Sequence, residues 1–516
     1  MVKKHKGPPG KGLGYLKKSR DEIKGYAIEY GLDFFDTYFE FLDFEEMNII
    51  AAYGGFPNRY PSWEFGMEYE RLQKSYRHGL HTIYEMVINN DPCWAYLLES
   101  NNLVDQKIVM AHVFGHSDFF KNNASFSQTN RKMMDAMANH ATKVRKYVDR
   151  YGIDTVESFI DLCRSISDLI DPHSVFIKRQ ADKPRFSLEV AKNGHPQIAQ
   201  KIPAKEYMNG YINPKNVIDA KQGRLDAEFA RQKQIEQKQD FPENPERDVM
   251  LFLIEHAPLE EWQREILWIM REEAYYFAPQ AETKIMNEGW ATYWHEKIMI
   301  EKCLTDSEII DFADHHSGTV AARAGQINPY RLGWKLWKDI EDRWNKGKFG
   351  KEYEECENYS ALASWDKKLG LGRDKIFEVR KIYNDISFVD EFFTEEFCLE
   401  NNFFTYVFNK EGGVYEIADR NWKNIKRKLL FSLTNFGRPF ICVKSGNFQN
   451  RSELLLQHRH EGIDLRQDFL QDTLENLRKI WGRTVHIETV AEGAKKLFSS
   501  KPILEESKKK KKKKKK

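Results

Sequence analysis

The clearest structural signal in the 516-residue sequence is MAHVFGHSDFFKNN, residues Met110–Asn123. His112 and His116 lie four residues apart, so a helix places both imidazoles on one face. The surrounding residues are mostly apolar or aromatic, which predicts that this helix is buried. Buried imidazoles need polar partners, and one shared cation would satisfy both of them.

A second segment, IMNEGWATYWHE at Ile285–Glu296, carries a matching polar stripe. Glu288 and His295 lie seven residues apart, two turns along one helical face, with Thr292 between them. Its Asn-Glu-Gly-Trp-Ala stretch resembles the segment that supplies a glutamate ligand in zinc aminopeptidases of the gluzincin type. In those enzymes the other two ligands are the histidines of HExxH on an earlier helix.

The two segments together predict a metal site with two histidines and one glutamate. His112, His116 and Glu288 are the expected ligands of a divalent cation, which we expect to be zinc, and a fourth position would stay open for water. We expect the ligands to be supported by three surrounding residues, Thr292, His295 and Tyr276. The cation could equally be structural, or a different metal could serve a different reaction.

One position departs from the HExxH pattern. The glutamate that follows the first histidine there takes a proton from water at the metal, but this chain has Val113, which cannot accept a proton. The candidate replacements are three carboxylates, Asp118, Glu255 and Glu273. His316, expected in a turn from which it could reach a substrate oxygen, is a further catalytic candidate. If none of them does this work, the site performs no hydrolysis of this type.

The spacing of apolar residues divides the chain into regions. Residues 21–393 predict a large, mainly helical, zincin-like body, because apolar residues recur there every three or four positions. A polar stretch at about 179–248 interrupts the body and is expected to form a surface insertion with an exposed helix at Gly223–Gln239. Thr305–Glu308 matches a capping box and predicts a short helix that ends at Ala313.

After residue 393 the pattern changes to short strands and helices. Residues 394–495 predict a small C-terminal α+β domain in which a hairpin followed by a helix occurs twice, so the fold class is α+β. The predicted elements are strands Phe397–Phe408 and Val414–Ala418, a helix after Asp419, strands Phe440–Lys444 and Glu453–Arg459, helix Asp468–Ile480 and strand Val485–Val490.

Positive charge gathers at the two ends of the chain. The net charge of +2 becomes −14 when the nine lysines of Lys508–Lys516 and the seven Lys and Arg residues of Met1–Arg20 are left out. We expect residues 1–20 and 496–516 to be a basic tail and a disordered lysine-rich tail. An acidic body argues against specific nucleic-acid binding, but the tails could contact an anionic surface weakly.

Composition excludes several classes of protein. With 41% hydrophobic and 13% aromatic residues, the chain is not wholly disordered. No apolar stretch reaches the ~18 residues of a transmembrane segment, and no secretory signal is recognisable, so we expect a cytoplasmic protein. The six cysteines are widely spaced, which is typical of reduced thiols rather than a disulfide framework.

Several unusual blocks resemble the stage V sporulation protein R (SpoVR) family and follow its order. They are Gly54–Pro61, Asn89–Pro92, His112–Asn123, Glu255–Pro258, Arg271–Gln280, Met286–His295, Asn328–Tyr330 and His458–Gly462. The resemblance covers most of the chain and is least clear in the polar stretch and the lysine tail.

The resemblance implies a cytoplasmic bacterial protein needed for normal spore cortex, a peptidoglycan layer, with relatives also in bacteria that form no endospores. It implies no established biochemical activity. Two hypotheses therefore stay open: a metal-dependent, hydrolase-like protein, or a non-catalytic regulator or scaffold of cortex assembly that binds a protein partner through its C-terminal domain.

Overall fold

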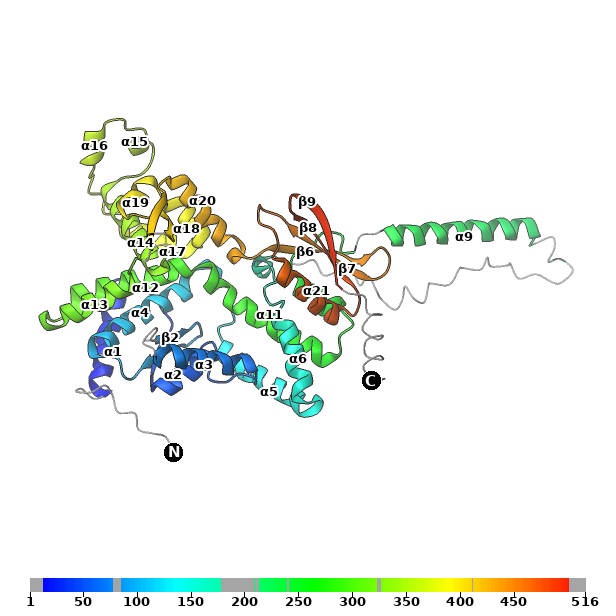
Figure 1. The fold of residues 1–516 in the computed structure, drawn as a ribbon, viewed down its shortest axis with the longest axis horizontal. Coiled ribbons are helices and arrows are strands. Elements are labelled where there is room, and N and C mark those ends of the chain that lie inside the picture. The colour runs from blue at the N-terminus through cyan, green and yellow to red at the C-terminus, as the bar shows by residue number, and fades with distance from the viewer. Residues whose placement is uncertain are drawn as a thin grey trace. The chain divides into compact units, whose positions relative to one another are not determined.

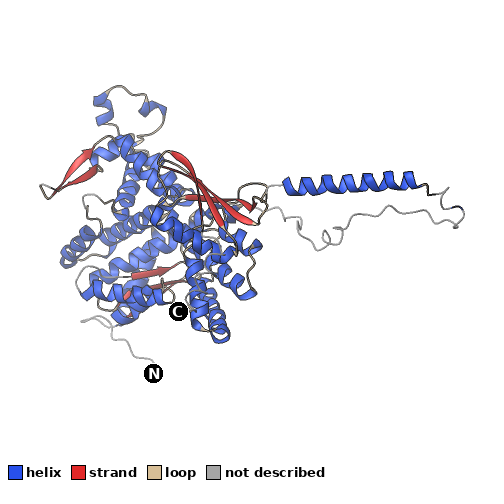
Figure 2. Cartoon of the chain, turned by 45° about the vertical axis from the view of Figure 1, so that its right-hand side comes forward, coloured by secondary structure: helices blue, strands red, loops and turns tan. Residues whose placement is uncertain are grey.

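The computed structural model describes residues 13–77, 85–177, 208, 213–238, 241–322, 326–410 and 412–500. Contacts divide the chain into two compact units, one of Met1–Cys163 with Glu265–Arg438 and one of Arg164–Arg264 with Pro439–Lys516. Most of the helices shown in Figures 1 and 2 belong to the first unit, and the four-stranded sheet belongs to the second. The predicted combination of a mainly helical body and a C-terminal α+β domain is confirmed.

Helices make up most of the first unit. Its described helices are α1 (Leu13–Glu29), α2 (Phe44–Ala52), α3 (Trp63–Arg77), α4 (Leu103–Asn122), α5 (Met133–Tyr151), α6 (Ile153–Arg164), α11 (Glu261–Glu282), α12 (Lys284–Ile298), α13 (Ile309–Thr319), α14 (Pro329–Lys346), α15 (Lys351–Glu354), α16 (Tyr359–Ala363), α17 (Gly372–Ile382), α18 (Asp385–Phe392), α19 (Glu395–Glu400) and α20 (Trp422–Leu433).

A small sheet in the first unit was not predicted. Strands β1 (Thr37–Leu42), β2 (Glu85–Ile88) and β3 (Cys93–Leu98) pair in the order β1-β3-β2. β1 runs parallel to β3, and β2 runs antiparallel to it. Strands of four to six residues give little periodic signal, which explains why they were missed beside long helices. The sheet matters because β2 contacts α4.

Helix α12 lies at the centre of the first unit, between α4 and α14 (Figure 1). Glycines allow the close approach on both sides. A Cβ atom on Gly115 of α4 would lie 2.7 Å from the Ala291 Cα, and one on Gly333 of α14 would lie 2.0 Å from the Ile285 carbonyl oxygen. Any side chain at these positions would therefore separate the helices.

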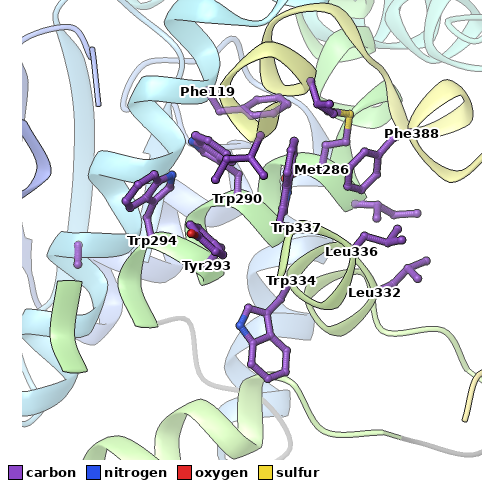
Figure 3. Packing of buried hydrophobic residues seen from close by; sticks show 14 of the residues in the cluster. Phe119, Met286, Trp290, Tyr293, Trp294, Leu332, Trp334, Leu336, Trp337 and Phe388 are labelled. Carbon is purple, nitrogen blue, oxygen red and sulfur yellow. The ribbon is translucent and has the colours of Figure 1, made fainter. Parts of the chain in front are cut away.

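The buried face of α12 is rich in tryptophan (Figure 3). Trp290 and Trp294 are fully buried, and the Trp290 ring packs edge-on against Trp337 of α14 at a centroid distance of 4.9 Å. Trp337 in turn packs against Phe388 of α18. Aromatic residues of this size bury much apolar surface, so they hold α12 in one position between its neighbours.

The N-terminus of α12 is capped by a carboxylate from another helix. Asp385, at the start of α18, accepts hydrogen bonds from the backbone N–H groups of Ile285 (2.8 Å) and Met286 (2.9 Å). The first amides of a helix have no partner within the helix, so this side chain satisfies two of them. Burial, opposed by these two donors, raises the pKa of Asp385 to about 8.

The second unit contains a four-stranded sheet in the order β6-β7-β8-β9. Its described elements are α9 (Lys215–Lys238), α10 (Val249–His256), β6 (Phe440–Phe448), β7 (Glu453–Arg459), α21 (Gln467–Trp481), β8 (Val485–Ala491) and β9 (Ala494–Ser499). The polar stretch ends in this unit, where Glu246 pairs with Val443 and the Phe241 carbonyl accepts from Gly446.

One predicted domain boundary differs from the structure. The first hairpin, β4 (Thr405–Asn409) and β5 (Val414–Asp419), and α20 belong to the first unit, so the C-terminal part of the second unit begins at Pro439 rather than at 394. The apolar face of α20 packs on the helical body through Ile425 and Leu429, which explains the difference.

The ends of the chain also differ from the prediction. Helix α1 begins at Leu13 and buries Leu16, so the expected tail of residues 1–20 is partly folded. Strand β9 occupies residues expected in the C-terminal tail, and Phe397 lies in a helix rather than a strand. The remaining tail residues, 1–12 and 501–516, lie outside the described residues.

We predict that Gly333→Ala destabilises the protein. The new Cβ would collide with the Ile285 carbonyl, and overpacking of this kind costs about 1–3 kcal/mol or more. The thermal unfolding midpoint should therefore fall by several degrees. Gly25→Ala is the matched control, because Gly25 is exposed on α1 and its Cβ would meet nothing within 4 Å. Equal midpoints for the two variants would contradict the close-packing argument.

Candidate metal centre

Two helices bring the three predicted metal ligands together. His112 and His116 lie on α4 and Glu288 lies on α12, and all three side chains are buried or nearly so. One ligand atom from each residue lies within 4.8 Å of the other two. Within the described ranges, this is the only group of three His, Cys, Asp or Glu residues with such an arrangement.

The distances suit ligands better than hydrogen-bond partners. Glu288 Oε2 lies 3.5 Å from His116 Nε2 and 3.8 Å from His112 Nε2. Ligands at about 2.0–2.1 Å from one tetrahedral cation lie roughly 3.4 Å apart. Good N–H···O hydrogen bonds are shorter, at about 2.7–3.2 Å. Glu288 Oε2 is a buried atom with no hydrogen-bond partner in the described part of the chain, as expected for a ligand atom.

The other ring nitrogen of each histidine is held by a buried polar group. His116 Nδ1 lies 2.9 Å from Asn287 Oδ1, and His112 Nδ1 lies 3.0 Å from His295 Nδ1. A carbonyl oxygen only accepts, so His116 carries its proton on Nδ1 and its Nε2 lone pair faces Glu288. Such partners fix the ring orientation and protonation of histidine ligands.

A chain of three imidazoles extends from His112. His295 Nε2 lies 3.0 Å from Nδ1 of His316 on α13. If His112 Nε2 is a ligand, its Nδ1 donates to His295, and His295 Nε2 must then donate to His316. His316 lies inside α13, which continues to Thr319, and not in a turn as predicted, because the helix runs past Ala313. The predicted capping box at Thr305–Glu308 is confirmed.

The electrostatics favour an ionised carboxylate at the site. Burial alone would raise the pKa of Glu288, but His112 and His116 outweigh it and hold this pKa well below its usual range. Burial lowers the pKa of His116, but Glu288 and Asn287 outweigh it and raise this pKa. Burial, followed by the neighbouring His112, lowers the pKa of His295 well below its usual value, which keeps that ring neutral.

Thr292 is completely buried, and its hydroxyl has no hydrogen-bond partner in the described part of the chain. Helical spacing places it on the same face of α12 as Glu288 and His295. Tyr276, by contrast, donates its hydroxyl to the Asn89 carbonyl at 3.1 Å and packs against Phe56. Its hydroxyl is already used, so the structure gives Tyr276 no role at this centre.

The three predicted carboxylate bases are engaged elsewhere. Asp118 is fully buried, pairs with Arg380 and accepts from Trp290 Nε1 at 2.8 Å. Glu273 pairs with Arg59 at 2.6 Å. Glu255 is exposed on α10 and belongs to the second unit. Neither Asp118 nor Glu273 is brought into the His₂Glu cluster.

Two residues near the ligands were missed from the sequence. Glu85, at the start of β2, has its Oε1 4.0 Å from His112 Nε2. Tyr330, near the start of α14, stacks on His112 with a ring centroid distance of 6.2 Å. Burial, followed by Glu288 and Glu85, raises the pKa of Tyr330 well above its usual value. Only the Asn328-Pro329-Tyr330 block gave a signal, because β2 itself was not predicted.

Comparison with known proteins identifies the type of protein to which this fold and centre belong. Residues 12–438 match the family described as SpoVR like protein, and residues 439–492 match the SpoVR-like C-terminal domain. The junction at 438 coincides with the last of the three points at which the chain passes from one structural unit to the other. The chain therefore belongs to the SpoVR family, which suggests a sporulation-associated protein.

A particular relative comes from Escherichia coli (strain K12) and is described as uncharacterized protein YcgB. It is 28% identical over 499 residues, which cover 90% of this chain and 90% of the relative. No solved structure matches the chain, so the predicted likeness to zincins stays a prediction. Among the described residues, the structure has no helix that is both long and apolar enough to span a bilayer.

We predict that His140 stabilises the first unit in a pH-dependent way. Burial lowers the pKa of His140, but Glu272 at 3.3 Å and Glu273 at 3.7 Å outweigh it and raise this pKa to about 9. A raised folded-state pKa means that the stabilisation is complete below the unfolded value of about 6.5 and is lost as pH rises through 9. The difference in unfolding midpoint between wild type and His140→Asn should shrink from pH 6 to pH 10. A constant difference would show that the histidine acts through packing alone.

Proposed function

We propose that this protein is a metal-dependent protein of spore formation, in which His112, His116 and Glu288 hold one divalent cation. The observation that carries the proposal is that two imidazoles and one carboxylate, from segments far apart in the sequence, meet at one place. The donor set of two histidines and one glutamate is typical of catalytic zinc, which supports zinc over other metals.

The chemistry that such a cation supplies is Lewis-acid activation of water or a carbonyl group. The protein's own contribution is orientation. Asn287 and His295 hold the two imidazole rings with their Nε2 atoms toward Glu288. A hydrolase-like reaction is therefore the activity that this centre supports best.

Family membership supports a proposal about the biological process. We propose that the protein acts in the cytoplasm and contributes to formation of the spore cortex, the peptidoglycan layer of the spore. A cytoplasmic enzyme would act on a precursor rather than on the finished layer, because the mature cortex lies outside the cytoplasm.

A second hypothesis is a non-catalytic regulator or scaffold. It is favoured by Val113, which removes the usual proton acceptor from the ligand helix. In this case the cation would stabilise α4 against α12, and a protein partner would bind the C-terminal unit. Weak contact of the basic termini with an anionic surface is a further proposal, but these residues lie outside the described part of the chain.

We predict that the purified protein contains about one equivalent of zinc. His116→Ala should remove nearly all of it, because a three-ligand site loses one of its three donors. The measurement is elemental analysis by plasma mass spectrometry after gel filtration. His315→Ala is the matched control, since His315 lies beside His316 but its Nδ1 bonds Asp105 at 2.9 Å. Zinc-free wild type, even after incubation with zinc, would contradict the metal site.

The catalytic and scaffold hypotheses differ in their response to Glu288→Gln. If catalysis is needed, spores from a strain with this variant should have a thin or abnormal cortex by electron microscopy, although the variant protein is present at normal level. The measurement includes an immunoblot and a thermal unfolding curve of the purified variant. Normal cortex with a folded, metal-free variant would exclude the catalytic hypothesis.

A further inference from the structure

We propose that Glu85 is the proton acceptor of this centre and replaces the glutamate that Val113 displaces from the ligand helix. This inference rests on the proposed metal site and adds to it a hydrolytic reaction on a carbonyl substrate. The catalytic carboxylate would then lie on β2, which packs against α4, and not on α4 itself.

The position of Glu85 fits this role. Its Oε1 lies 4.0 Å from His112 Nε2, on the side of the imidazole that faces Glu288. Its side chain is 21% exposed, compared with 18% for Glu288, so both carboxylates are largely removed from solvent. The contact is too long for a direct hydrogen bond, so the carboxylate approaches the ring without being fixed to it.

The Glu85 carboxylate is also available, because within the described part of the chain it forms no hydrogen bond with another side chain and only approaches His112. The competing carboxylates differ in this respect. Asp118 accepts from Arg380 and Trp290, and Glu273 accepts from Arg59 and Tyr60. A carboxylate with several fixed donors is a poor proton acceptor, since each donor stabilises its ionised form.

Pairing with strand β3 fixes the position of the Glu85 backbone. Glu85 pairs with Leu97 and Val87 pairs with Ala95, and both partners are buried on β3. β3 pairs on its other side with β1, so β2 is held by a sheet rather than by a loop. A rigid element is the support that a catalytic carboxylate needs.

Tyr330 supplies a matching hydrogen-bond donor. Its ring lies nearly parallel to His112, with an interplanar angle of 16°, and its hydroxyl interacts with Glu288. A phenol hydroxyl in this position can donate a hydrogen bond to an oxygen that gains negative charge. The pair of Glu85 and Tyr330 thus provides an acceptor and a donor on two different elements around the ligands.

The reaction that these groups support is hydrolysis of an amide. The Glu85 carboxylate takes one proton from water, and the resulting hydroxide adds to the carbonyl carbon. The C–N bond then breaks, and the proton passes from Glu85 to the leaving nitrogen. The products are a carboxylic acid and an amine, and Glu85 returns to its ionised form, so no oxidant or further reactant is needed.

The test measures two quantities for each variant, its zinc content and its affinity for acetohydroxamate. Acetohydroxamate is a small zinc ligand whose proton a neighbouring carboxylate can accept. Glu85→Gln should retain about one equivalent of zinc but bind acetohydroxamate at least tenfold more weakly by calorimetry. Tyr330→Phe should weaken binding by a smaller factor. Glu40→Gln, an exposed carboxylate on β1 of the same sheet, is the matched control and should change neither quantity.

The outcomes separate this inference from the proposed function. If Glu85→Gln keeps its zinc and binds acetohydroxamate as tightly as wild type, Glu85 is not the proton acceptor, although the metal site stands. If Glu85→Gln loses its zinc, Glu85 is a metal ligand and the inference is wrong. If wild type binds no zinc, the proposed function fails and the inference fails with it.

Discussion

The close packing of α12 between α4 and α14 is the constraint on which the first unit depends. At Gly115 and at Gly333 the neighbouring backbone occupies the space where a side chain would begin. This short separation allows the imidazoles of α4 and the carboxylate of α12 to face one another within a few ångströms. A wider gap would leave buried polar side chains without partners, which is energetically unfavourable.

Helix α4 carries two polar arrangements with different roles. On one side, His112 and His116 face Glu288 at distances suited to a shared cation. On another, Asp118 is fully buried and fixed by Arg380 and Trp290. The first arrangement has a buried oxygen without a hydrogen bond, whereas the second satisfies its charge with permanent donors. This difference separates a candidate ligand site from a structural ion pair, although both consist of polar residues in an apolar helix.

The sequence predicted the contacts that a recognisable motif marks, and it failed where distant segments meet without such a motif. The four-residue spacing of His112 and His116 and the Asn-Glu-Gly block were sufficient to bring the three ligands together in the prediction. Glu85 was missed because nothing in a four-residue strand indicates which helix it will contact. Asp118 and Glu273 were misjudged because their partners, Arg380 and Arg59, lie more than 200 residues away. The boundary at 438 was missed because α20 is amphipathic in either unit, and only its packing decides where it belongs.

Helix α12 receives its N-terminal cap late in synthesis, because Asp385 comes well after α12 in the sequence. All three candidate ligands have been synthesised once residue 288 has been added to the chain, but the group that caps α12 is then still about 100 residues from synthesis. Trp337 and Phe388, which cover the same helix, also come later. The nascent chain thus holds a complete set of donors on an uncapped helix for as long as this downstream stretch is being translated. The final arrangement of the three candidate ligands is therefore a property of the nearly finished body and not of the first 288 residues alone.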